Sequence, residues 1–116
     1  MPYAKLKHPD ELWEERRKRV ENSLRVISLE ELLMTLRQHE EEFVGNPWRD
    51  EFLRLMQERP QPTFYQAIAQ DDVMIYYCRE ADFGVWVVPN SGIGPLDETS
   101  KRITKEVIAK SCFARS

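Results

Sequence analysis

The sequence predicts an α+β fold, in which an N-terminal helical layer packs on a small antiparallel β-hairpin or sheet that is followed by a C-terminal helix. Three observations lead to this prediction. Apolar side chains recur at helical spacing over the first sixty residues, two runs of β-branched and aromatic residues occupy positions 73–88, and a helical pattern returns over positions 99–110. A chain of 116 residues has the length of one domain, so we expect a single domain over residues 1–116.

The first predicted helix starts at Pro9 and runs to about Asn22. Proline suits the first helical position, and Asp10 and Glu11 follow it where the helix dipole favours acidic groups. Its apolar positions are sparse, which is typical of a helix that covers a core rather than forming one. The next stretch, residues 24–27, is either a short edge strand or the frayed end of this helix.

Two further helices are predicted before residue 60. Ser28 is a good N-cap, with Glu31 placed to complete a capping box, and the leucine-rich stripe behind it extends to a stop at Gly45. Asn46 and Pro47 then open another helix, which ends at the prolines 60 and 62. Because the connection between the two helices is very short, we expect them to pack together as a helical hairpin or corner.

The second half of the chain changes to a strand pattern. Residues 73–79 and 83–88 are rich in β-formers and are joined by a short turn, which predicts a β-hairpin. Both faces of the hairpin are apolar, so it is either covered on both faces or covered on one and used for association on the other. Residues 63–70 are ambiguous: Ala and Gln favour a short helix, and a strand is the alternative.

Residues 91–96, SGIGPL, resemble a phosphate-binding loop at first sight, but the chemistry is against it. The dinucleotide-binding pattern needs a third glycine where Asp97 stands, and Pro95 has no N–H to offer. Asp97 is better interpreted as the N-cap of the last helix, with Gly92 and Gly94 in a loop that acts as a hinge into it. Such a loop can line a pocket for an uncharged or cationic ligand.

Composition and charge disfavour several classes of function. The chain carries 17 basic and 20 acidic residues, for a net charge of −3, so nucleic-acid binding is not favoured. The basic run at residues 16–19 has Glu14 and Glu15 at pairing distance, which indicates a solvated helix face. His39 and Glu42, within the acidic run 40–42, share a helix face but a metal site needs at least a third ligand, so no metal site and no cofactor are expected.

No catalytic motif is recognisable, and we favour a non-enzymatic protein. Cys78 adjoins Arg79, but strand alternation sends the two side chains to opposite faces, so a buried structural cysteine is expected rather than a nucleophile. With Cys112 it makes only two cysteines, too few for a disulfide framework. Neither a signal peptide nor a membrane-spanning apolar run is expected, so the default location is the cytoplasm and no membrane partner is predicted.

Aromatic residues crowd the predicted hairpin and suggest where a partner would bind. The candidate binding residues are Tyr76, Arg79, Trp86, Gly92 and Gly94. The first hypothesis is a protein–protein association or regulatory module that uses the aromatic hairpin surface to bind a protein partner or a second copy of itself. The alternative is a small-molecule-binding protein or small enzyme, with a pocket between the hairpin, the 91–96 loop and the C-terminal helix.

Overall fold

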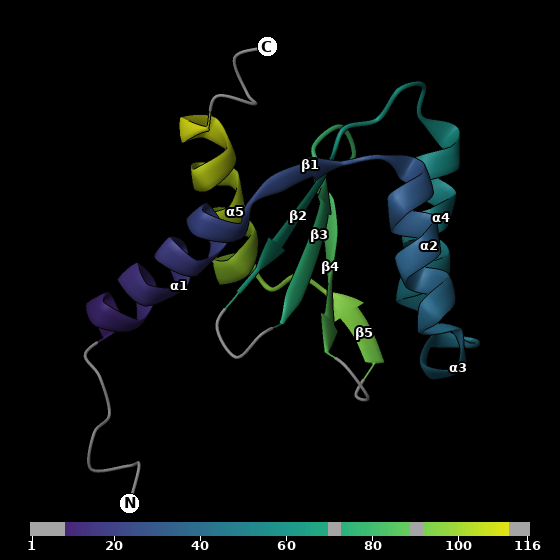
Figure 1. Cartoon of the computed structure of the whole chain (residues 1–116), viewed down its shortest axis with the longest axis horizontal. Coiled ribbons are helices and arrows are strands. Elements are labelled where there is room, and N and C mark those ends of the chain that lie inside the picture. Colours follow the sequence, from purple (N-terminus) through teal and green to yellow (C-terminus); the bar gives the residue numbers. More distant parts are fainter. Residues whose placement is uncertain (1–8, 70–72, 89–91, 112–116) are drawn as a thin grey trace, which may run out of the picture.

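A computed structural model describes residues 9–69, 73–88 and 92–111, and in it helices cover both faces of an antiparallel sheet (Figure 1). The N-terminal part contains α1 (Pro9–Ser23), β1 (Arg25–Ile27), α2 (Leu29–Gln38), α3 (Glu40–Phe43) and α4 (Pro47–Glu58). The remainder contains β2 (Phe64–Ile68), β3 (Met74–Cys78), β4 (Phe83–Val88), β5 (Gly92–Pro95) and α5 (Glu98–Lys110). The predicted α+β class, with helices before the sheet and one helix after it, is confirmed.

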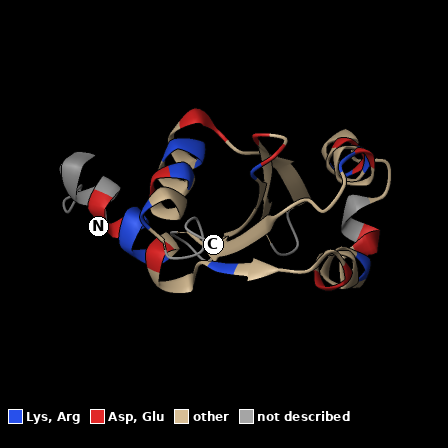
Figure 2. Cartoon of the chain, turned by 90° about the horizontal axis from the view of Figure 1, so that it is seen from above, with Lys and Arg blue, Asp and Glu red and all other residues tan. Residues whose placement is uncertain are grey.

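The strands of the described residues form a meander, in which each strand pairs with the next one along the chain in the order β1-β2-β3-β4-β5. All four pairings are antiparallel. The sheet lies between α1 and α5 on one side and α2 and α4 on the other (Figure 1). Seen from above, the strands are mostly uncharged, and basic and acidic residues are interspersed on the helices (Figure 2). The sheet is therefore the middle layer of three.

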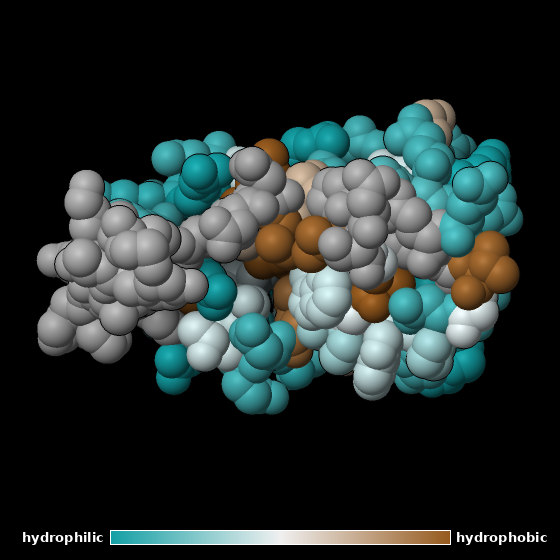
Figure 3. Space-filling view, turned by 90° about the horizontal axis from the view of Figure 1, so that it is seen from below, coloured by the Kyte–Doolittle hydropathy of each residue, from teal (hydrophilic) through white to brown (hydrophobic). Residues whose placement is uncertain are grey.

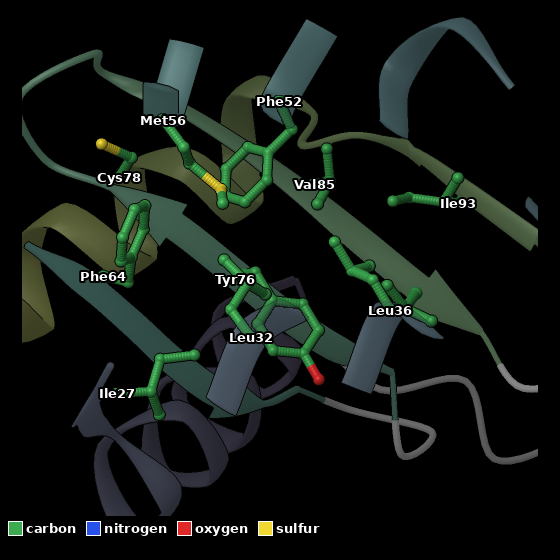
Figure 4. Packing of buried hydrophobic residues seen from close by; sticks show 11 residues of the cluster. Ile27, Leu32, Leu36, Phe52, Met56, Phe64, Tyr76, Cys78, Val85 and Ile93 are labelled. Atoms are coloured by element: carbon green, nitrogen blue, oxygen red, sulfur yellow. The ribbon is translucent and has the colours of Figure 1, made fainter. Parts of the chain in front are cut away.

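One face of the sheet packs against α2 and α4 (Figure 4). Phe52 of α4 lies at the centre of this cluster, with ring centroids 6.3 Å from Phe64 and 6.0 Å from Phe83. Leu32 and Leu36 of α2 complete the contact from the other helix. Both helices therefore bury their apolar sides in one cluster on the same face of the sheet, and their packing against each other as a helical hairpin or corner stays a prediction.

The opposite face of the sheet packs against α1 and α5. Val20 of α1 and Ile103 of α5 are completely buried against Ala67 and Ile75 of the sheet. This second cluster explains why both faces of the hairpin strands are apolar. Of the two alternatives that the sequence left open, the hairpin covered on both faces is the one that the fold adopts.

Side-chain caps start three of the helices, as predicted. Ser28 Oγ accepts a hydrogen bond from Glu31 N at 3.1 Å, Asn46 Oδ1 accepts from Trp48 N at 2.8 Å, and Asp97 Oδ1 accepts from Ser100 N at 2.6 Å. The capping box at Ser28 is half formed, because the Glu31 carboxylate pairs with Arg25 at 2.9 Å.

The predicted helix from Ser28 to Gly45 is interrupted at His39, which was not expected. His39 has φ −111° and separates α2 from the short helix α3. In one continuous helix, the acids at positions 40–42 would lie at the C-terminal end, where the dipole is unfavourable to them. The break places them instead in the first turn of a new helix, where negative charge is favoured.

Within the ambiguous segment 63–70, Phe64–Ile68 form a strand and residue 70 lies outside the described residues, so the preference for a short helix was wrong. Phe64–Ile68 pairs with β1 on one side and β3 on the other, so this strand is internal to the sheet. Its residues alternate between the two apolar clusters, with Phe64 in one and Ala67 in the other. Pairing with a neighbouring strand on both edges outweighs the helix propensity of Ala and Gln. Residues 25–27 form the edge strand β1, so of the two alternatives for this stretch, an edge strand or the frayed end of the first helix, the strand is correct.

Within the glycine-rich segment 91–96, Gly92–Pro95 form a strand and residue 91 lies outside the described residues, which corrects the prediction of a hinge. Gly92–Pro95 pairs with β4, so that Gly92 lies opposite Val88 and Gly94 opposite Trp86. Asn46 ties this strand to the start of α4, because its Nδ2 donates to Ile93 O at 3.1 Å. The prediction was wrong because glycine and proline disfavour strands in general, whereas an edge strand tolerates them and β5 is at the edge of the sheet.

Candidate functional site

A pocket of about 240 Å³ lies between the sheet and the two helices α1 and α5, at the end of the sheet where β4 ends and β5 begins. We call it the Trp86 pocket. It is lined by Arg16, Ala69, Val73, Ile75, Trp86, Val88, Leu96, Asp97 and Ser100. Seen from this end of the molecule, hydrophobic residues gather in the middle of the face with hydrophilic residues on both sides (Figure 3).

Trp86 forms a wall of the pocket because Gly94 lies opposite it in the sheet. A β-carbon built on Gly94 would lie 2.4 Å from Trp86 Cζ2 and 2.8 Å from Cε2, far inside van der Waals contact. The indole ring therefore lies across the backbone of β5 where only glycine leaves room. In the same row of the sheet, Ile75 and Ala67 follow Trp86 on the neighbouring strands. Trp86 is thus flanked in the sheet by Gly94 on one side and by Ile75 on the other.

The polar wall of the pocket comes from both helices. Arg16 of α1 donates from Nη1 to Ser100 Oγ of α5 at 3.3 Å, a bond that links residues 84 positions apart. Asp97 stands at the rim as the N-cap of α5. The pocket thus combines an apolar floor with a guanidinium, a hydroxyl and a carboxylate.

Arg16 is the pocket residue that sequence reasoning missed, because the basic run at 16–19 was interpreted as a solvated face. Lys18 and Arg19 are indeed exposed, and Arg17 pairs with Glu14 at 2.6 Å. Arg16 and Arg17 are both half-buried, but Arg16 is the one that lines the pocket. The available signal was helical spacing: Arg16 lies four residues before Val20, which is completely buried, so both belong to the inner face of α1.

The predicted binding residues separate into two groups. Trp86 and Gly94 meet at the pocket, and Gly92 adjoins it as the register partner of Val88. Gly92 has φ +113°, a conformation that only glycine adopts readily. The structure thus brings three of the five predicted residues to one end of the sheet, between the hairpin, β5 and α5, where the alternative hypothesis placed a pocket.

Tyr76 and Arg79 do not belong to this site. Tyr76 is 1% exposed and points into the cluster beneath α2 and α4 (Figure 4), where its hydroxyl accepts from Gln66 Nε2 at 3.1 Å. Burial raises the pKa of this phenol. Arg79 follows β3 at the opposite end of the sheet and is exposed, with its guanidinium carbon 5.9 Å from the centre of the Tyr65 ring.

A second polar cluster surrounds Asp82 in the turn between β3 and β4. Tyr77 donates from its hydroxyl to Asp82 Oδ1 at 2.5 Å, and Lys101 and Lys105 of α5 lie 3.3 and 3.4 Å from the same carboxylate. The hydrogen bond from Tyr77 is the main cause that lowers the pKa of Asp82, and the ammonium groups of Lys101 and Lys105 lower it further. Burial is the main cause that raises the pKa of Tyr77, and the hydrogen bond to the Asp82 carboxylate raises it further. These contacts hold the β3–β4 turn against α5. Asp82 itself has φ +49°, in the left-handed region.

A wider surface hollow of about 470 Å³ adjoins Asp82, but it makes a weaker candidate than the Trp86 pocket. Apart from Asp82, all its lining residues lie on α5: Glu98, Lys101, Arg102, Lys105, Glu106 and Ala109. Acidic and basic side chains are interspersed in this hollow, and because it lies on the surface of a single helix it has no apolar floor for a ligand. The smaller Trp86 pocket has the architecture that ligand sites usually have.

Cys78 is in an environment that disfavours nucleophilic chemistry. Its side chain is 1% exposed within the apolar cluster, and its thiol donates to Glu80 Oε2 at 3.7 Å. Burial raises the pKa of the thiol. Since the thiolate is the reactive form, the geometry agrees with a structural cysteine.

Comparisons with known proteins add no assignment: a scan against family models and searches of the curated proteins and of the solved structures each found no match. Within residues 9–69, 73–88 and 92–111, no three His, Cys, Asp or Glu side chains come together as metal ligands. Over the same ranges no helix has both the length and the apolar character needed to cross a bilayer.

Proposed function

We propose that this protein binds a small, largely apolar molecule in the Trp86 pocket. The observation that carries the proposal is the indole ring of Trp86, which lies across Gly94 as one wall of a 240 Å³ hollow with an apolar floor. Ligand pockets are mostly apolar with a few placed polar groups, and here those groups are Arg16, Asp97 and Ser100. This is the alternative that the sequence raised.

The size of the pocket limits the ligand. Drug-sized ligands occupy pockets of about 300–1,000 Å³, and the Trp86 pocket is smaller. A single aromatic ring with a short substituent fits this volume. Roughly ten non-hydrogen atoms that contribute about 0.4 kcal/mol each correspond to a Kd near 1 mM, which sets the concentration range for detection.

Binding is supported better than catalysis. Among the described side chains that line the pocket, Asp97 is committed to capping α5, and Arg16 carries only donors. The Ser100 hydroxyl accepts from Arg16, so it faces a cation rather than a base that would activate it. These roles suit recognition of a ligand, and none of them supplies a general base.

Association through the hairpin, the first hypothesis from the sequence, stays a prediction with less support. Tyr76 and Tyr77 are each at most 2% exposed, so their aromatic area lies inside the chain and is not offered to a partner. Phe83 and Trp86 are half-buried and are the hairpin aromatics that retain some surface. Sedimentation at micromolar concentration tests the self-association branch.

The experiment is an NMR titration of ¹⁵N-labelled protein with phenylacetamide, a neutral single-ring probe, up to millimolar concentration. We expect saturable shifts of the Trp86 indole N–H and of the Gly94 and Ser100 amides. In Trp86→Ala, which has no indole signal at this position, we expect the shifts of the Gly94 and Ser100 amides to disappear. Trp48→Ala is the matched control, because Trp48 is 40% exposed on α4, away from the pocket, and its removal leaves binding unchanged. Shifts that do not saturate, or that persist in Trp86→Ala, contradict the proposal.

A further inference from the structure

We infer that the molecule bound in the Trp86 pocket is a carboxylic acid, whose carboxylate is held by the guanidinium of Arg16 and the hydroxyl of Ser100 while its apolar part packs on Trp86. The inference rests on the proposed function and names the chemical class of the ligand. It departs from the uncharged or cationic ligand that the sequence suggested, because Arg16 reaches the pocket from the distant helix α1.

Arg16 provides the positive charge. Its side chain is half-buried on the inner face of α1, and its contact to Ser100 is a 3.3 Å bond to a neutral hydroxyl. That distance is long for a bond from an ionised donor, which closes to about 2.7–2.9 Å when the acceptor is a carboxylate. A guanidinium at the edge of an apolar hollow is therefore poorly satisfied by Ser100 and well matched to a carboxylate.

Ser100 provides a second donor beside the first. Its Oγ accepts from Arg16, which leaves the hydroxyl hydrogen to be donated in another direction. Ser100 lines the pocket and is 9% exposed, so its hydroxyl lies at the inner end of the polar wall. Two adjacent donors facing one hollow match the two oxygens of a carboxylate.

Asp97 is the group that would favour a cation, and its surroundings argue against that role. Its Oδ1 accepts from Ser100 N at 2.6 Å, so its charge is stabilised by the first turn of α5. It is exposed, whereas Arg16 is half-buried, and solvent screens the outer charge more strongly than the inner one. The field inside the pocket is therefore dominated by Arg16. Asp97 at the rim also explains why a singly charged carboxylate suits the site better than a doubly charged phosphate.

The apolar lining selects the rest of the ligand. Trp86 and Val88 of β4 and Ile75 of β3 line the pocket from the sheet, and Leu96 lines it from the segment between β5 and α5. A ring stacked on the indole places a one-carbon carboxylate substituent toward α5. Arylacetic acids have this shape and fit the limited volume.

The test compares three probes of one shape and different charge at pH 7: phenylacetate, phenylacetamide and phenethylamine. We expect phenylacetate to bind about tenfold more tightly than phenylacetamide, and phenethylamine to bind most weakly. Arg16→Gln lowers the affinity for phenylacetate to that for phenylacetamide and leaves phenylacetamide unchanged. Arg17→Gln is the matched control, since Arg17 is the next residue on α1 and pairs with Glu14. It leaves all three affinities unchanged.

The outcomes separate this inference from the proposed function. Equal affinity for the acid and the amide, tightest binding of the amine, or equal loss of acid and amide binding in Arg16→Gln overturns the carboxylate assignment while the pocket remains a binding site. Absence of saturable binding by all three probes overturns the proposed function itself. Tighter binding of phenyl phosphate than of phenylacetate also contradicts the assignment, because it shows that Asp97 does not limit the charge.

Discussion

Replacing Gly94 by Ala should destabilise the protein only while Trp86 is present. The added β-carbon would lie 2.4 Å from Trp86 Cζ2, where ordinary carbon contacts are about 3.5–4.0 Å, so the ring must move by about an ångström. Overpacking of this kind costs about 1–3 kcal/mol. Gly94 has no positive φ, so alanine itself is compatible with the backbone and returns about 0.4–1 kcal/mol through the unfolded state. The expected net loss is about 1–2 kcal/mol.

A double-mutant cycle isolates the contact. In a Trp86→Ala background the clash is absent, and Gly94→Ala should be neutral or slightly stabilising, which gives a coupling free energy of about 1–3 kcal/mol. The assay is urea unfolding followed by far-UV circular dichroism, because tryptophan fluorescence changes with the mutation. For urea m-values of about 1–3 kcal/mol per molar, the midpoint of the single variant should fall by roughly 1 M.

Gly92→Ala is the control for this cycle. Gly92 has φ +113°, and nothing lies within 4 Å of the position that a β-carbon would take there, so alanine costs about 1–3 kcal/mol through backbone strain alone. That loss should be the same with and without Trp86. A coupling below about 0.5 kcal/mol between positions 86 and 94, or an equally large coupling between 86 and 92, would refute the reasoning.

Three further changes test other parts of the fold by urea or pH titration. Phe52→Ala empties the centre of the cluster under α4 and should cost about 3–5 kcal/mol, against less than about 1 kcal/mol for the exposed Trp48→Ala. Asn46→Ala removes the cap of α4 and the bond to Ile93 O together, for a loss of about 2 kcal/mol, whereas Asn46→Asp keeps the cap oxygen and should lose less. The pKa of Asp82 is lowered in the folded protein, so its contribution to stability is present above about pH 4, the unfolded value, and disappears as the pH falls through the lowered one. Asp82→Asn keeps a residue that tolerates φ +49°, and the acid-induced loss of stability below pH 4 should be smaller in this variant than in the wild type; identical pH profiles would exclude a stabilising role for the contacts of Asp82.

The sequence by itself determined the features that depend on neighbours within one turn of the chain. The caps at Ser28, Asn46 and Asp97 were predictable because each joins a side chain to a backbone N–H two or three residues away. The β3–β4 hairpin was predictable for the same reason, since its two strands are joined by a short turn. Local hydrogen bonds and spacing carry this information, so the helices, the hairpin and the α+β class follow from it.

Only the tertiary structure decided which weak segments became strands and which side chains met. Residues 64–68 mix β-formers with the helix-favouring Ala and Gln, and residues 92–95 have poor strand propensity. Both are strands because the backbone groups of neighbouring strands pair with theirs. Arg16 reaches Ser100 across 84 residues because α1 and α5 pack on the same face of the sheet. Contacts between segments distant in sequence are selected by the burial of whole faces, which no local pattern records. The Trp86 pocket is a product of that selection.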